Sequence, residues 1–322
     1  MLVMTIRGDS TLNQAGHRFR LHPTLPWKVL AHRVSYEIFK DNVFGRAAEL
    51  AYFFLFSLLP LLLVLSNLLG LVSDGRRIQQ DMLRYFSSVM PWTAYRLLAT
   101  TLDQVVRSSG GAKLSLGILI TLATASNGMV AIIEGLNTAY EVKEGRSWWK
   151  RRVVALALTL GLAILTITAL AMVLYGTDFG GFLTTQLGFG RMFESAWRVV
   201  QWPLVAAFVL LAFTLVYRFA PNVKDQRWHW ILPGAVVAFL LWLLASFGLR
   251  LYLQLFNSFP AMYGSLGAVM VLMLWLYLFG TAVLIGGEVN SIVEQSAARA
   301  GDPEAKLPGE KAPGEAERPM HS

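Results

Sequence analysis

Four charged residues beside long apolar stretches are the first candidates for chemistry in this chain. Glu49, Glu134 and Glu288 lie near the ends of such stretches, and Arg218 closes another. Charged groups this close to a hydrocarbon layer are costly unless they reach water or a partner, so they commonly mark functional positions. We expect Arg218 to pair with one or more of the carboxylates in a vestibule at one face. The alternative is that each side chain reaches water and headgroups from its own helix end.

A second set of candidates is neutral and lies deeper within the apolar stretches. Ser126 and Asn127 lie midway along one stretch, close to Thr124, and Ser57 precedes Pro60 in another. Proline lacks the amide that would bond the carbonyl four residues earlier, which permits a kink. These five residues are candidates for a substrate path or a headgroup groove. The alternative is that they only pack helices together, as these residue types often do in membranes.

The sequence offers little for the common forms of enzyme catalysis. It has no cysteine, which excludes a thiolate zinc site, and none of its five histidines has metal-binding spacing. A phosphate-cradling glycine loop and the Gly-x-Ser-x-Gly nucleophile elbow are also missing from the sequence. We therefore predict a protein that is not an enzyme, with no catalytic residue, metal or cofactor.

The elements that position these residues come from a strongly apolar chain. Of 322 residues, 55% are hydrophobic and 15% are charged, whereas a soluble domain carries about 25% charged residues. Helices of about 20 apolar residues cross a bilayer core. Six runs are long enough: Ala47–Val72, Leu114–Tyr140, Val153–Tyr175, Trp202–Phe219, Ile231–Phe256 and Leu266–Val289. We predict an all-α, polytopic membrane protein with six transmembrane helices.

The distribution of basic residues predicts the orientation of these helices. Six spans place both termini on one side, and the segments on that side hold 19 of the 28 Lys and Arg residues. The strongest signal is the loop Glu141–Arg152, which contains five of them beside Trp148 and Trp149. By the positive-inside rule, both termini are cytoplasmic. The net charge of +8 is then explained by topology, and no nucleic-acid partner is needed.

Three segments lie outside the predicted six-helix domain, which spans residues 45–292. The N-terminal segment 1–44 is predicted to be cytoplasmic and to contain an amphipathic helix over Trp27–Lys40, which lies at the headgroups or packs under the bundle. Residues 74–112 show helical periodicity on both sides of a proline and are predicted to form an extracytoplasmic cap. Residues 293–322 are predicted to be a disordered cytoplasmic tail.

Several short motifs, in order along residues 35–295, resemble those of the YihY/virulence factor BrkB family. They are Ala48–Pro60, Leu136–Val142, Tyr217–Asn222, Leu232–Ala235, Tyr263–Gly267 and Gly287–Asn290. Phe53 and Phe54 depart from the Tyr and Thr that are frequent there. The resemblance implies a bacterial inner-membrane protein with six helices. Members have carried the label ribonuclease BN, which looks like a misassignment, and others are associated with serum resistance or envelope integrity.

The favoured functional hypothesis is a transporter-like module, without enzymatic activity, for a lipid or small amphiphile in envelope integrity. The expected partners are membrane lipids and that amphiphile, and a homo-oligomer stays open. The first alternative is a scaffold that binds envelope partners through the apolar helix predicted at Ala94–Val106. The second, disfavoured, is a membrane-associated ribonuclease.

Overall fold

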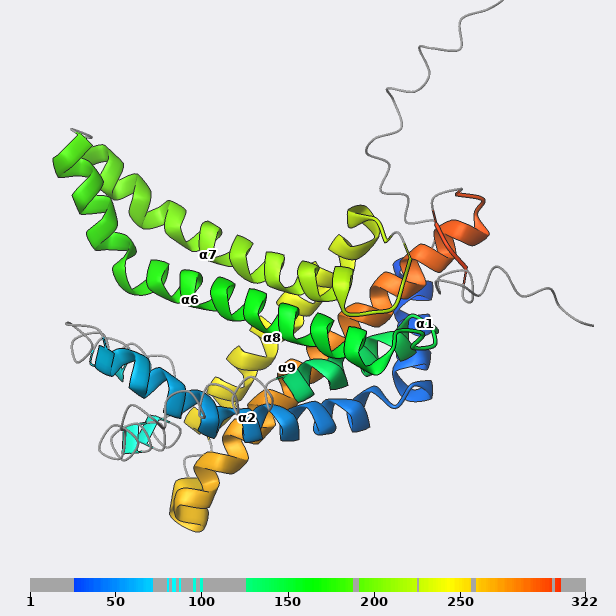
Figure 1. Ribbon diagram of the computed structural model, residues 1–322, viewed down its shortest axis with the longest axis horizontal. Helices are drawn as coiled ribbons and strands as arrows, with labels where there is room; N and C mark the ends of the chain where they lie inside the picture. Colours follow the sequence, from blue (N-terminus) through cyan, green and yellow to red (C-terminus); the bar gives the residue numbers. More distant parts are fainter. Residues whose placement is uncertain are drawn as a thin grey trace, which may run out of the picture.

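All regular secondary structure in the part of the chain that the structure describes is helical. The computed structural model describes residues 26–71, 126–187, 191–224, 226–255, 259–302 and 305–307, with a few isolated positions between 80 and 100. The helices are α1 (Trp27–Lys40), α2 (Val43–Leu71), a segment over 126–139, α6 (Trp148–Leu187), α7 (Arg191–Phe219), α8 (Trp228–Leu255) and α9 (Phe259–Arg299) (Figure 1). The predicted all-α class is confirmed.

Four of these helices contain stretches long and apolar enough to cross a membrane. The stretches are Trp148–Val173, Val199–Phe219, Trp228–Leu255 and Gly267–Arg299, and they coincide with the last four predicted runs. The helix α2 covers nearly all of the first run. The second run is helical over 126–139, and its beginning lies outside the described residues, as does most of the predicted cap. The described chain therefore supports several spans but does not confirm six.

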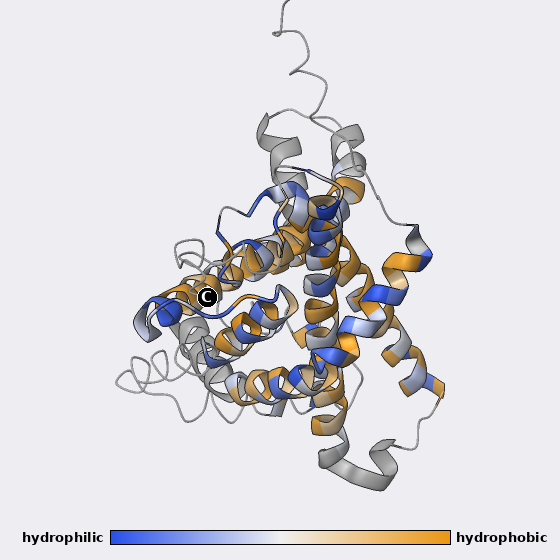
Figure 2. Cartoon of the chain, turned by 90° about the vertical axis from the view of Figure 1, so that its right-hand side faces the viewer, coloured by the Kyte–Doolittle hydropathy of each residue, from blue (hydrophilic) through white to orange (hydrophobic). Residues whose placement is uncertain are grey.

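The outer faces of these helices are apolar and exposed. Ile164 and Ile167 on α6 and Leu244 on α8 each expose about two thirds of their surface, and many other large apolar side chains do the same. Figure 2 shows that hydrophobic residues make up much of these helices. A soluble protein rarely exposes contiguous apolar areas of this extent. The natural solvent for these faces is lipid.

The helix α9 is the central element of the packing. It contacts α1, α2 and α8, while α6 packs along α7 and α7 packs on α8 (Figure 1). Where α8 crosses α9, Gly234 lies against the backbone of Gly286, and a Cβ atom at either position would clash. Small residues allow membrane helices to approach this closely. The Tyr217 hydroxyl reinforces the junction by donating a 2.7 Å hydrogen bond to the Val283 carbonyl oxygen.

The predicted amphipathic helix is present as α1 and packs beneath the bundle. Val34 and Ile38 from its apolar face belong to the main core, together with Leu50 of α2. The helix contacts α2 and α9, so the packed alternative describes it better than a helix lying only at the headgroups. Its position brings Lys40 within 3.0 Å of Glu141 in the loop that precedes α6.

The last helix is longer than its apolar run. It was predicted to end at Val289, but α9 continues to Arg299, so residues 293–299, predicted to belong to a disordered tail, are helical. Ile292 and Ala297 in this extension are buried, which explains why the helix persists. Beyond it, the Lys306 ammonium group donates to the Lys224 carbonyl oxygen. The chain after 307 lies outside the described residues.

Candidate functional site

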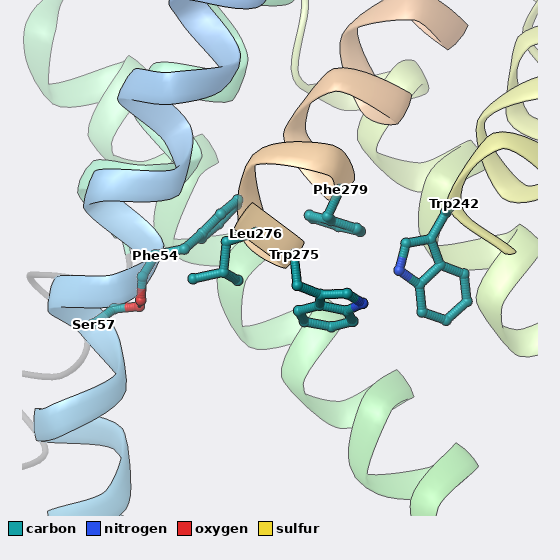
Figure 3. A pocket seen from close by; sticks show the side chains of 6 residues that line it. All are labelled: Phe54, Ser57, Trp242, Trp275, Leu276 and Phe279. Atoms are coloured by element: carbon teal, nitrogen blue, oxygen red, sulfur yellow. The ribbon is translucent and has the colours of Figure 1, made fainter. Parts of the chain in front are cut away.

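An apolar cavity of about 200 Å³ lies where α2, α8 and α9 meet. Figure 3 shows the aromatic and aliphatic side chains that converge on it from the three helices. The lining residues are Phe54, Ser57, Trp242, Trp275, Leu276 and Phe279. Phe54 and Phe279 meet edge to face with ring centroids 5.8 Å apart, which joins the α2 wall to the α9 wall. Such a space suits a hydrocarbon chain or ring.

The few polar groups around this cavity are not equally satisfied. The Ser57 hydroxyl donates to the Phe54 carbonyl oxygen at 2.8 Å, and the Trp275 indole donates to the Ser246 hydroxyl at 3.1 Å. The Trp242 indole N–H is buried and has no hydrogen-bond partner among the described residues. Buried donors nearly always have a partner. The Trp242 N–H is therefore available to an acceptor on a bound molecule.

Of the predicted path residues whose side chains the structure describes, Ser57 alone lines this cavity. Ser57 lines it, whereas Ser126 is fully buried elsewhere. Asn127 is exposed, and its side-chain oxygen accepts a 2.7 Å hydrogen bond from Arg152. The helix α2 continues through Pro60 without a break in its helical assignment. Thr124 lies outside the described residues.

The four predicted charged residues do not form one network in the described structure. Glu134 pairs with Arg151 at 2.8 Å instead of with Arg218, because Arg151 lies in the first turn of α6, directly after the loop that follows the Glu134 helix. Glu49 is exposed on α2. Glu288 is almost completely buried and lies near Asp41 at the end of α1. Each carboxylate therefore has its own surroundings, and Arg218 lies in a separate hollow.

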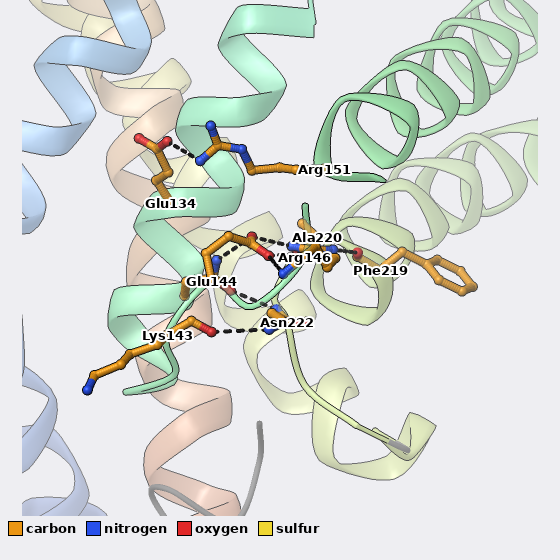
Figure 4. Close-up of polar contacts among 9 residues, drawn as sticks. Glu134, Lys143, Glu144, Arg146, Arg151, Phe219, Ala220 and Asn222 are labelled. Atoms are coloured by element: carbon orange, nitrogen blue, oxygen red, sulfur yellow. Dashed lines mark hydrogen bonds and ion pairs between the residues drawn. The ribbon is translucent and has the colours of Figure 1, made fainter. Parts of the chain in front are cut away.

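A set of hydrogen bonds clasps the loop before α6 to the loop after α7 (Figure 4). The Asn137 side chain accepts from the Asn222 backbone amide at 2.7 Å and donates to Glu144 at 2.9 Å. Arg146 binds Glu144 with its side chain and also donates to the Ala220 carbonyl oxygen at 2.8 Å. Asn137 belongs to the motif Leu136–Val142, and Ala220 and Asn222 belong to Tyr217–Asn222, so the clasp gives those motifs a structural role.

The clasp also sets the charge state of its carboxylate. Partial burial alone raises the pKa of Glu144, but the hydrogen bonds and charge of Arg146, with help from Asn137, outweigh burial and lower this pKa below its ordinary value. Glu144 is therefore ionised at neutral pH and holds Arg146 in place. The pairing of Glu144 with Arg146 was not predicted from the sequence, although their spacing in a basic loop was a usable signal.

A buried polar group on α9 was only partly predicted. Besides Glu288, the side chains of Asn290, Ser291 and Glu294 are at most 1% exposed. The Asn290 side-chain oxygen accepts a 2.6 Å hydrogen bond from the Gly234 amide, which fixes the start of α8 to α9. The sequence contained a signal for this buried group, because these polar residues interrupt or directly follow an apolar run. The predicted end of the span at Val289 left Asn290, Ser291 and Glu294 outside the span, and Glu294 outside the predicted membrane domain as well.

A basic hollow of about 410 Å³ lies between the end of α7 and the start of α8. It is lined by Arg218, Gln226, Arg227, Trp228 and His229. The Arg218 guanidinium also lies 5.9 Å from the centre of the Phe219 ring. The Gln226 side chain is buried, and its amide lies against the buried Tyr140 hydroxyl. The hollow gathers basic side chains at the junction of the two helices.

With this geometry in place, comparison with known proteins decides the family. Residues 34–309 match the family described as virulence factor BrkB. The chain belongs to this family. It is 35% identical over 254 residues to the ribonuclease-like protein YfkH of Bacillus subtilis, covering 78% of this chain and 90% of that protein. No solved structure matches it.

Other BrkB relatives are longer proteins named as membrane proteins. The UPF0761 membrane protein Smlt0865 of Stenotrophomonas maltophilia is 30% identical over 260 residues, and XAC0937 of Xanthomonas axonopodis is 29% identical over 254 residues. The chain spans a little more than half the length of these two relatives. These names agree with the exposed apolar helices. Within the described residues, no group of three or more His, Cys, Asp or Glu side chains is arranged to hold a metal ion.

Proposed function

We propose that this BrkB-family protein is a transporter-like module of the bacterial inner membrane that accommodates a lipid or small amphiphile and thereby serves envelope integrity. It has six spans, cytoplasmic termini and no enzymatic activity. The observation that carries the proposal is the cavity between α2, α8 and α9, with its aromatic walls and the unpartnered Trp242 N–H. An amphiphile has both an apolar part for the walls and an acceptor for this donor.

The surroundings of the cavity support this assignment. The helices that form it expose apolar faces suited to lipid, so a lipid-borne molecule reaches the cavity without crossing water. Ser57 keeps hydroxyl lone pairs after donating to the Phe54 carbonyl oxygen, which gives the wall an acceptor as well. Thr124, Ser126 and Asn127 stay candidates for a path on the second predicted span.

The test is native mass spectrometry of lipids bound to the purified protein. Leu276→Trp fills the cavity and should abolish retained lipid, whereas Trp148→Phe changes an exposed tryptophan remote from the lining residues and should not. Trp242→Phe removes the N–H while it retains an aromatic ring, and should weaken binding about fivefold, the equivalent of one neutral hydrogen bond of about 1 kcal/mol. Retention by a folded Leu276→Trp variant equal to that of the wild type would refute the proposal.

The proposed orientation has its own test. A reporter fused after Lys150 should be active only as a cytoplasmic protein, because that loop carries the densest positive charge. If the reporter at this position were instead periplasmic, the proposed topology would be wrong. A reporter fused near residue 90, in the predicted extracytoplasmic cap, is the control and should give the opposite result.

A further inference from the structure

We propose that the amphiphile bound in the cavity between α2, α8 and α9 is an isoprenoid quinone, whose ring lies between the aromatic walls and whose carbonyl oxygen accepts a hydrogen bond from Trp242. This inference rests on the proposed function and names its substrate class. It depends on the depth of the cavity, its size, its aromatic walls and the unpartnered N–H of Trp242.

The cavity lies midway along two of the helices that form it. Ser57 is the central residue of Val43–Leu71, and Trp242 is near the centre of Trp228–Leu255. Both helices coincide with predicted spans, so the cavity lies at the depth of the bilayer interior. No charged side chain is among its lining residues. A phosphate or carboxylate is costly in such surroundings, so the group that binds there is neutral.

The size and the walls of the cavity favour a single ring system. In the core of another protein, a cavity of about 150 Å³ holds one benzene ring. The volume of about 200 Å³ between α2, α8 and α9 therefore suits one substituted ring, whereas a whole phospholipid is too large. Four of the six lining residues carry aromatic rings (Figure 3). Aromatic rings pack well by their faces and edges, so a planar ring fits these walls better than a saturated chain.

Trp242 specifies the polar group of the ligand. Its indole nitrogen points toward Trp275 and Phe279 of the α9 wall in Figure 3, and it is buried without a hydrogen-bond partner among the described residues. An indole nitrogen can only donate, so the ligand must supply an acceptor. Trp230 on the same helix also has a buried N–H without a partner in the described chain, but it does not line the cavity. The unpartnered N–H indicates a ligand only at Trp242, where there is space for one.

An isoprenoid quinone combines these properties. Its ring is planar and neutral, its carbonyl oxygens accept hydrogen bonds, and its apolar tail keeps it in the bilayer. A phospholipid has its acceptors near the headgroup boundary, and a hydrocarbon chain has none. Phe56, Leu243 and Leu274 are each next to a lining residue in the sequence and are about half exposed. The tail can therefore extend from the cavity into the surrounding lipid.

The experiment compares two ligands that differ chiefly in the acceptor. The compounds 2-decyl-1,4-benzoquinone and decylbenzene share a six-membered ring and a chain, but only the first has carbonyl oxygens. Native mass spectrometry measures the binding of each to the full chain in mixed micelles. The wild type should bind the quinone about fivefold more tightly, the gain expected from one neutral hydrogen bond.

Two tryptophan variants separate the hydrogen bond from the general effect of losing an indole. Trp242→Phe retains a ring without the N–H, so it should bind the two ligands equally. Trp230→Phe is the matched control, because it removes a buried N–H of the same helix that does not face the cavity. It should keep the preference of the wild type for the quinone.

Three outcomes would overturn the inference. The first is a wild type that binds decylbenzene as tightly as the quinone, a result that does not depend on whether any variant folds. The second is a Trp242→Phe variant that prefers the quinone as strongly as Trp230→Phe does. The third is binding of decanol as tight as that of the quinone, which would assign the cavity to alcohols.

A failure here is distinguishable from a failure of the proposed function. If Leu276→Trp abolishes retained lipid but the wild type shows no preference for the quinone, the substrate class is wrong and the cavity assignment stands. If Leu276→Trp leaves retained lipid unchanged while Trp242→Phe loses the preference for the quinone, the proposed lipid function fails and quinone binding stands.

Discussion

The crossing of α8 and α9 predicts a large effect from a single methyl group. In Gly286→Ala, the new Cβ would lie 2.6 Å from the Gly234 carbonyl oxygen and closer still to the Tyr217 hydroxyl, whereas real Cβ atoms essentially never approach within 3.0 Å. The helices must separate by at least about 0.4 Å at this point. Overpacking of this kind costs about 1–3 kcal/mol, and loss of the hydrogen bond from Tyr217 adds about 1 kcal/mol. We expect a total loss of about 2–4 kcal/mol.

The assay is reversible unfolding in mixed micelles, followed by tryptophan fluorescence. Gly248→Ala on α8 is the matched control, because nothing lies within 4 Å of its new Cβ. It should leave the free energy of unfolding unchanged or raise it by up to about 1 kcal/mol, since alanine favours the helix. Tyr217→Phe removes the nearest clashing atom and should reduce the cost of Gly286→Ala. Equal effects of the two alanine substitutions would refute the close packing described at this crossing.

Three further predictions concern polar groups. Asn290→Leu leaves the Gly234 amide without its acceptor and should destabilise the protein by about 1–3 kcal/mol in the same unfolding assay; an unchanged midpoint would contradict this role. The pKa of Glu144 is lowered in the folded protein, so its stabilising effect is present above its ordinary pKa of about 4.5 and is lost as the pH falls below that value. The melting temperature of the wild type should therefore fall in acid more steeply than that of Glu144→Gln. The pair of Glu134 with Arg151 is partly exposed, so Glu134→Gln should cost less than about 1 kcal/mol, and a larger loss would indicate a more buried partner.

The sequence was informative wherever one apolar run forms one helix. Trp27–Lys40 matches α1 to the residue, and the last four predicted spans each lie within a helix, apart from the terminal residue of Ile231–Phe256. Such runs are local and need no knowledge of neighbours. The end of α9 was misplaced because Ile292 and Ala297 are helical through packing, and packing has no signature in hydropathy alone.

The candidate site was harder to predict because it depends on which helices meet. Ser57 was identified as a polar residue in an apolar run, but its cavity needs Trp242 and Phe279, which lie about two hundred residues further along the chain. Likewise, Glu134 was expected to pair with Arg218, but the structure pairs it with Arg151, which the sequence analysis did not consider as its partner. The periodicity of apolar residues along the sequence does not show which spans lie close together.

The pair of α6 and α7 has the geometry of a long arm that is fixed at its base by the clasp. The 40 residues of α6 extend about 60 Å, and none of its described side chains beyond Leu158 is buried. A rotation of about 5° at the base therefore sweeps the far tip through about 5 Å. A lateral force on the tip would therefore be felt at the base, where the ion pair of Arg146 with Glu144 is tied to the loop after α7.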